Sequence, residues 1–144
     1  MIAPDAPTAS GPIRLVVHVD GGARGNPGPA AIGVVVSDPA GGVIEELAET
    51  IGVTTNNEAE YRALLRALEL AARLGAQEVR IYGDSELVAK QVRGEYKVKH
   101  PRMKELHEQA IVALGRFPRV TITTVPRAQN ARADELVNRA LDGV

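Results

Sequence analysis

Four acidic residues lie far apart in the sequence, each in a polar setting that could support chemistry: Asp20, Glu60, Asp84 and Asp134. If the fold gathers them, their charges repel, and each carboxylate raises the pKa of its neighbours unless a cation lies between them. A set of ligands made only of oxygens is typical of Mg²⁺ or Mn²⁺ rather than zinc, which prefers His and Cys. The four acids therefore predict metal-assisted chemistry on phosphates.

Three of these acids also have a structural explanation when taken alone. Asp20 precedes two glycines and could form a turn, and Asp84 precedes Ser85 and could cap a helix. Asp134 lies in the first turn of the last predicted helix, where the helix dipole favours an acid. Single residues leave both explanations open.

The fourth acid must be separated from its neighbour Glu58. Thr55 and Glu58 have the spacing of a capping box, which gives Glu58 a structural role and leaves Glu60 without one. Both glutamates flank the apolar stripe of the predicted helix, on opposite sides, so helical periodicity does not choose between them.

The elements that would position these residues follow from hydrophobic periodicity. Three strands come first and are expected to form an antiparallel meander, and helical connections then favour strands parallel to the first. The carboxyl ends of parallel strands share one sheet edge, where open α/β sheets bind ligands. We predict strands at 13–20, 31–37, 43–51, 78–83 and 119–125, a loop at 21–29, and helices at 61–74, 85–93, 101–115 and 130–141.

Length and composition indicate one ordinary globular domain. The chain has 144 residues and no cysteine, which excludes disulfides and thiolate metal sites. No apolar run approaches the length of a membrane span, and residues 1–12 lack the regions of a signal peptide. We expect a flexible tail at 1–12, a domain at 13–142, no membrane association, a cytoplasmic location and, by default, a monomer.

A basic segment stands out against a net charge of −1. Between Lys90 and Lys104 there are six Lys or Arg residues and one acid, Glu95. A solvated helix surface is one interpretation. The other is a binding surface for a polyanion held beside the carboxylates.

The motifs that contain the four acids, taken together, resemble ribonuclease H of type 1. The resemblance rests on Asp20-Gly21-Gly22, on Gly-Asn-Pro-Gly-Pro at 25–29, on Thr55-Asn56-Asn57 before Glu60, on Gly83-Asp84-Ser85, and on Ala133-Asp134-Glu135-Leu136. It covers about residues 13–141 and is similar to the bacterial and archaeal form with a shortened basic region.

The resemblance implies a fold and an activity. The fold would be α/β, a five-stranded mixed sheet with three antiparallel strands and then two parallel ones, flanked by helices. The activity would be hydrolysis of the RNA strand of RNA–DNA hybrids, largely independent of sequence, leaving 5′-phosphate and 3′-hydroxyl ends. Two Mg²⁺ or Mn²⁺ ions would be held by Asp20, Glu60, Asp84 and Asp134, with Asp20 between both ions and Asp134 on the side of the attacking water.

The same resemblance implies substrate contacts. Asn56 and Asn57 match positions that read the minor groove of the hybrid, and Asn26 and Thr55 match positions that grip a phosphate of the DNA strand. Glu86 stands where many members carry Gln. The full set of substrate-binding candidates is Gly21, Gly22, Asn26, Thr55, Asn56, Asn57, Ser85, Glu86, Lys97, Lys99, Arg127 and Asn130.

One departure from the family pattern bears on mechanism. Many members carry a His in the loop before the last carboxylate, but residues 125–134 contain none. Arg127, Gln129 or Asn130 could stand in, although Arg stays protonated and is a poor base. We therefore expect activity without a His-assisted step. A hybrid-binding module without turnover and a junction resolvase or integrase core are the alternatives.

Overall fold

The computed structural model describes residues 11–144, and the predicted tail at 1–12 falls mostly outside that range. The elements alternate as the periodicity predicts, with a short 3-10 helix added before the last α-helix. In chain order they are β1 (Arg14–Ala23), β2 (Gly28–Ser37), β3 (Val43–Thr54), α1 (Asn56–Arg73), β4 (Glu78–Gly83), α2 (Glu86–Val92), α3 (Pro101–Leu114), β5 (Arg119–Thr124), η2 (Arg127–Asn130) and α4 (Ala131–Asp142).

The strands form one five-stranded sheet in the order β3-β2-β1-β4-β5. β1 pairs antiparallel with β2, and β2 pairs antiparallel with β3. β1 and β4 are parallel, as are β4 and β5. This is the mixed sheet that was expected, with three antiparallel strands followed by two parallel ones.

The predicted loop at 21–29 is shorter in the structure. β1 continues past Asp20, so that Gly22 pairs with Ala31 and Ala23 pairs with Ala30. Glycine and alanine carry no signal of alternation, which is why the pattern there reads as a loop. Asp20 consequently lies inside an antiparallel ladder, just beyond His18, the last β1 residue paired with β4.

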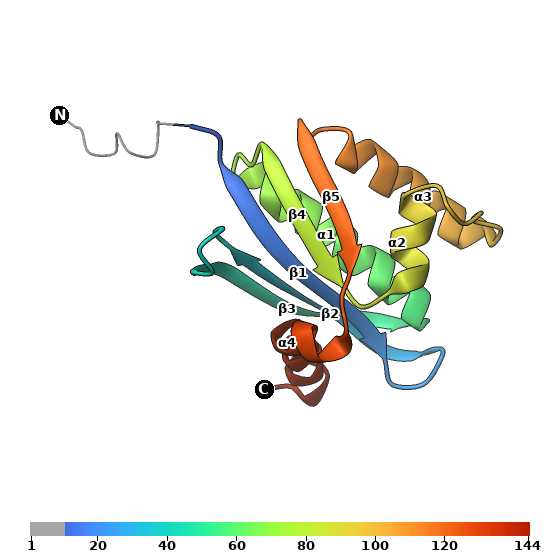
Figure 1. Ribbon diagram of the computed structural model, residues 1–144. Helices are drawn as coiled ribbons and strands as arrows, with labels where there is room; N and C mark the ends of the chain where they lie inside the picture. Colours follow the sequence, from blue (N-terminus) through green and yellow to red (C-terminus); the bar gives the residue numbers. More distant parts are fainter. Residues whose placement is uncertain (1–10) are drawn as a thin grey trace.

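Helices lie on both faces of the sheet, as Figure 1 shows. α1, α2 and α3 are on one side, where Leu15, Val17 and Val19 of β1 face the main core. α4 lies on the other side against β2, β3 and part of β1. β2 is covered on both faces, which explains why nearly all of its residues are buried.

Two contacts fix the helices that border the acidic residues. Thr55 caps α1, accepting a hydrogen bond from the Glu58 amide at 3.2 Å. The buried Tyr61 hydroxyl of α1 donates to Gln91 of α2 at 2.6 Å and joins the two helices. No helix in the described part of the chain is long and apolar enough to cross a membrane.

α4 approaches the sheet closely at Gly33 of β2. A Cβ added there would collide with the carbonyl oxygen of Ala133 and lie 3.0 Å from Cβ of Leu136. Only glycine lets α4, which carries Asp134, pack this near to β2.

We predict that Gly33→Ala destabilises the protein by about 1–3 kcal/mol, the usual cost of overpacking, because α4 must move away from β2. The change in free energy of unfolding can be measured by urea denaturation. Gly22→Ala is the matched control, since its Cβ would meet only Cγ1 of Val137 at 3.7 Å. Equal stability of the two variants would contradict this account.

Candidate active site

The four acidic residues come from β1, α1, the connection between β4 and α2, and α4, and they line one open cleft of about 370 Å³. Carboxylate oxygens of Asp20, Glu60 and Asp84 lie within 4.8 Å of one another. Asp134 lines the same cleft from α4 but is outside this close group of three. The structure thus brings together all four residues that the sequence singled out.

The structure answers the alternative explanations for two of these acids. Asp20 pairs with Gly33 inside the β1–β2 ladder, so it does not form a turn. Ser85, not Asp84, is the N-cap of α2, because its hydroxyl accepts from the Val88 amide at 3.2 Å. Asp134 does lie in the first turn of α4, so its favourable position near the helix dipole accompanies its place in the cleft.

Glu58 and Glu60 point to different surroundings. The Glu60 carboxylate accepts a hydrogen bond from the Gly21 amide at 2.7 Å, which holds it beside Asp20. Glu58 lies away from the cleft and forms an ion pair with Arg102 at 3.0 Å. The capping box is formed in one direction, from the Glu58 amide to Thr55. The capping argument therefore selected the glutamate that lies in the cleft, although the Glu58 carboxylate is occupied by Arg102.

β1 and α1 can approach this closely only because position 21 is glycine. A Cβ at Gly21 would collide with the carbonyl group of Ala59, immediately before Glu60. The Gly21 amide can then reach the Glu60 side chain. Gly21 therefore serves helix–strand packing, and Gly22 continues the β1–β2 ladder opposite Ala31.

Burial and mutual repulsion make the cluster unfavourable when it carries its full negative charge. The pKa of Asp20 is raised to about 8, first by burial and then by the charges of Asp84 and Asp134. The pKa of Glu60 is raised well above its usual value by burial and by Asp20 and Asp84, although the Gly21 amide opposes this. A divalent cation would supply the positive charge that protons otherwise provide.

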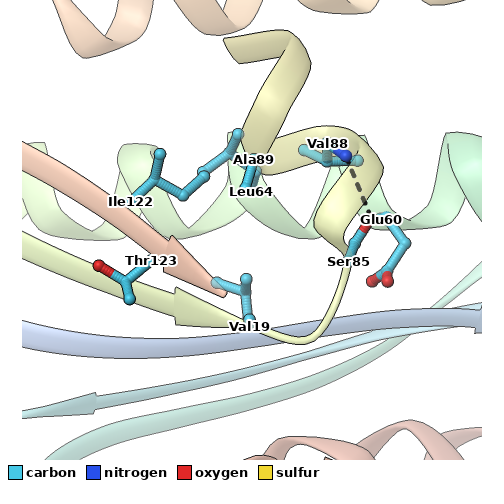
Figure 2. A pocket seen from close by; sticks show the side chains of 9 residues that line it. Val19, Glu60, Leu64, Ser85, Val88, Ala89, Ile122 and Thr123 are labelled. Atoms are coloured by element: carbon cyan, nitrogen blue, oxygen red, sulfur yellow. Dashed lines mark hydrogen bonds between the residues drawn. The ribbon is translucent and has the colours of Figure 1, made fainter. Parts of the chain in front are cut away.

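An apolar pocket behind Glu60 accounts for part of this burial. Figure 2 shows Glu60 and Ser85 beside Val19, Leu64, Val88 and Ile122. The pocket has a volume of only about 20 Å³, which holds no ligand larger than a water molecule. Its apolar walls lower the local dielectric and strengthen the interactions among the charges in the cleft.

No histidine lines the cleft, and all three histidines belong to the described residues. His18 stacks on Tyr82, His100 caps α3, and His107 lies 3.1 Å from the carbonyl of Gln91. Arg127 occupies the loop before α4, and its guanidinium lies 3.4 Å from a carboxylate oxygen of Asp134. Asp134 raises the pKa of Arg127 further, so this residue stays a cation and does not serve as a base.

The candidates at the entrance to α1 form a connected group. Asn26 accepts from the Asn56 amide at 3.0 Å, and the Asn56 side chain accepts from the Ala23 amide at 2.8 Å. Asn57 is exposed next to them. Gly21, Gly22, Asn56 and Arg127 line the cleft itself.

The remaining candidates lie elsewhere. Lys97 and Lys99 are exposed between α2 and α3, and Glu86 is exposed and paired with Lys90 at 3.3 Å. Asn130 is only 1% exposed, and its side-chain amide donates to the carbonyl of Val19 at 2.8 Å. The structure places Asn130 in the framework that ties the start of α4 to β1, not on a surface that a substrate could touch.

The basic segment is less positive than its composition suggests. Arg93 pairs with Glu95 at 2.7 Å, Lys90 with Glu86, and Arg102 with Glu58. Two further polar residues line the cleft without having been predicted, Arg24 and Asn138. Asn138 was detectable, because it lies four residues after Asp134 on the same face of α4.

The chain has extensive similarity to known proteins. The profile of the family described as "Reverse transcriptase-like" matches residues 18–140. Ribonuclease HI of Halobacterium salinarum is 46% identical over 90% of this chain and 65% of its own length. A bifunctional protein of Mycobacterium tuberculosis is 45% identical over 90% of this chain but only 36% of its own length. The chain thus spans less than two thirds of these curated relatives.

Solved structures agree in fold. The crystal structure of RNase H1 from H. salinarum superposes with a TM-score of 0.89, covering 91% of this chain and 99% of that one. LC11-RNase H1 in complex with an RNA/DNA hybrid has a TM-score of 0.86 at 46% identity, covering 90% of this chain and 97% of that one.

The raised pKa of Asp20 predicts how stability depends on pH in the absence of metal. Because the folded value of about 8 exceeds the ordinary 3.8, the folded protein keeps a proton that the unfolded chain has lost. The contribution of this retained proton to folding stability is complete below about pH 4 and is lost as the pH rises through about 8. In EDTA, Asp20→Asn should therefore be more stable than the parent by up to about 5 kcal/mol near pH 8 and by less than about 2 kcal/mol near pH 5, at about 1.4 kcal/mol for each pKa unit.

Urea denaturation at both pH values measures this difference. Asp38→Asn is the control, because Asp38 lies outside the cleft and accepts hydrogen bonds in the β2–β3 turn. Parallel pH profiles for Asp20→Asn and the parent would show that Asp20 is not the buried, repelled carboxylate described above.

Proposed function

The chain belongs to the ribonuclease H family, and from that premise we propose that it hydrolyses the RNA strand of RNA–DNA hybrids with two divalent metal ions. The observation that carries the proposal is the cleft in which four separate segments of the chain place Asp20, Glu60, Asp84 and Asp134. The hybrid bound by LC11-RNase H1, a structure of the same fold at 46% identity, supports the choice of substrate.

Each carboxylate has a proposed role in holding the ions, which would be Mg²⁺ or Mn²⁺. Asp20, the most central and buried of the four, would contact both ions, with Glu60 and Asp84 completing one site and Asp134 the other. The bound ions would lower the pKa of the attacking water, neutralise the scissile phosphate and stabilise the leaving oxygen. The Gly21 amide keeps Glu60 in place, and Arg127 adds a fixed positive charge beside Asp134.

Hydrogen bonds within the chain leave donor groups at the entrance to α1. The side-chain oxygens of Asn26, Thr55 and Asn56 already accept bonds from backbone amides. Their NH₂ and OH groups are therefore the part that remains to donate, which suits phosphate oxygens and the 2′-hydroxyl of RNA. We place Asn26 and Thr55 on the DNA strand and Asn56 and Asn57 in the minor groove.

The other contacts are weaker parts of the same proposal. Gly21 and Gly22 would let the backbone approach the hybrid. Ser85 and Glu86 would contact the hybrid from the start of α2. Lys97 and Lys99 would add electrostatic attraction to the DNA strand. Such contacts read backbone and shape, so we propose cleavage largely independent of sequence, leaving 5′-phosphate and 3′-hydroxyl ends.

All four carboxylates come from one chain, so the site needs no second copy. We accordingly propose a monomer acting in the cytoplasm. The absence of a cleft histidine within the described residues leaves the four carboxylates, Arg24 and Arg127 as the ionisable groups that line the cleft.

Glu60→Gln should reduce hybrid cleavage by at least about 100-fold, because even partners of metal ligands contribute 10–100-fold. Glu58→Gln is the matched control on the same helix and should keep nearly full activity, since Glu58 faces Arg102. Initial rates over a range of Mg²⁺ and Mn²⁺ concentrations measure both variants. Equal rates for Glu60→Gln and Glu58→Gln would refute the assignment of Glu60.

A substrate panel separates this function from its alternatives. The parent protein is incubated with hybrid, duplex RNA, duplex DNA and branched DNA, with Mg²⁺, with Mn²⁺ and with EDTA. We expect cleavage of the hybrid's RNA strand, only with metal. Binding of the hybrid without any cleavage would indicate a module that has lost turnover, and cleavage of branched DNA alone would indicate a resolvase.

A further inference from the structure

One face of the sheet stays uncovered beside the cleft. Within residues 11–144, α4 packs on β2, β3 and part of β1, and leaves β4 and β5 bare on that side (Figure 1). Arg80, Arg119, Thr121 and Thr123 are accordingly exposed. A hollow of about 460 Å³ lies over β4 and the start of β5.

The parallel register arranges the side chains of this face in rows across β1, β4 and β5. Because side chains alternate along a strand, every second residue points to the same side. The rows are Arg14, Glu78 and Arg119, then Val16, Arg80 and Thr121, then His18, Tyr82 and Thr123. The next residue of β1 on this side is Asp20, so the face leads directly into the cleft.

The far end of the face is positively charged. Arg14, Arg80 and Arg119 all lie within 4 Å of the single carboxylate of Glu78. Their side chains are 58%, 57% and 80% exposed, whereas that of Glu78 is 16% exposed. One carboxylate cannot neutralise three guanidinium groups, so a local excess of two positive charges faces solvent in a chain whose net charge is −1.

An aromatic pair lies between the arginines and the cleft. The rings of His18 and Tyr82 stack with centroids 5.3 Å apart and planes 27° from parallel. Both residues are partly exposed. Aromatic faces on an open sheet stack with unpaired bases, and arginines beside them bind the phosphates.

We propose that this face, which we call the arginine face (Arg14, His18, Arg80, Tyr82 and Arg119), binds a single-stranded continuation of the RNA strand that enters the cleft. This proposal rests on the proposed function, because it requires that the RNA strand passes the carboxylates. Six residues separate Arg14 from Asp20, so the face extends roughly 20 Å from the cleft at ~3.3 Å per residue. A duplex presents no unpaired bases to the aromatic pair, and an acidic peptide has no bases, so a single strand fits best.

The test compares a blunt hybrid with the same hybrid carrying an RNA extension of about eight nucleotides at its 5′ or its 3′ end. One of the two extensions should lower KM at least about fivefold, the lower end of what one base stacked on an aromatic side chain contributes. The triple variant Arg14→Gln, Arg80→Gln, Arg119→Gln should lose this advantage and cleave the blunt hybrid as the parent does. The triple variant Arg62→Gln, Arg66→Gln, Arg73→Gln on α1 removes equal charge elsewhere and should keep the advantage.

Binding measured by fluorescence anisotropy in EDTA keeps the two proposals distinguishable, since it needs no cleavage. The slope of log K against log salt concentration for the extended hybrid should become shallower by about 2 when the three arginines are removed. Each phosphate contact of a single strand contributes ~0.7 to that slope. Three results would overturn the proposal for the arginine face. The parent could gain nothing from either extension, or the gain could survive in the arginine-face variant. Polyglutamate could also displace the extended hybrid as well as single-stranded RNA does. Failure to cut the blunt hybrid would overturn the nuclease proposal alone.

Discussion

The repulsion among buried carboxylates is the constraint on which the rest of the site depends. Asp20 and Glu60 are held together because β1 and α1 meet at Gly21, where a side chain would not fit. Burial and like charge then raise the pKa of both acids. Packing of the core, including the contact between Tyr61 and Gln91, supplies the free energy that keeps this arrangement in place. A cleft built in this way favours a proton or a cation among its carboxylates.

The arrangement of positive groups around the cleft follows from the same constraint. Arg127 lies against Asp134, on the side of the cluster that is most open to solvent. The arginines of the sheet face stand farther away and neutralise a different acid, Glu78. Positive charge thus lies in two places, at the cleft and at the far end of the sheet face, so a polyanion would meet it at more than one point along its length.

Much of this could be predicted from the sequence, and the exceptions have physical reasons. Alternating and helical periodicity located every strand and α-helix, because most of those elements bury one face; β2, which is buried on both, is a nearly unbroken apolar run. The pattern after Asp20 predicts a loop where the strands in fact continue, since glycine and alanine carry no alternation even when they pair. The side chain of Asn130 was assigned to the surface because an amide in a polar loop looks the same whether it meets a substrate or the carbonyl of Val19. Only tertiary packing distinguishes the two cases.

The order of the four acids along the chain has a consequence for synthesis. Asp20, Glu60 and Asp84 leave the ribosome before Asp134, whose helix packs back onto β2 through Gly33. Contacts so distant in sequence form late, because the intervening chain must first be ordered. A nascent chain would therefore hold an incomplete set of ligands until α4 has docked. Docking of α4 is therefore the step that completes the four-carboxylate cleft.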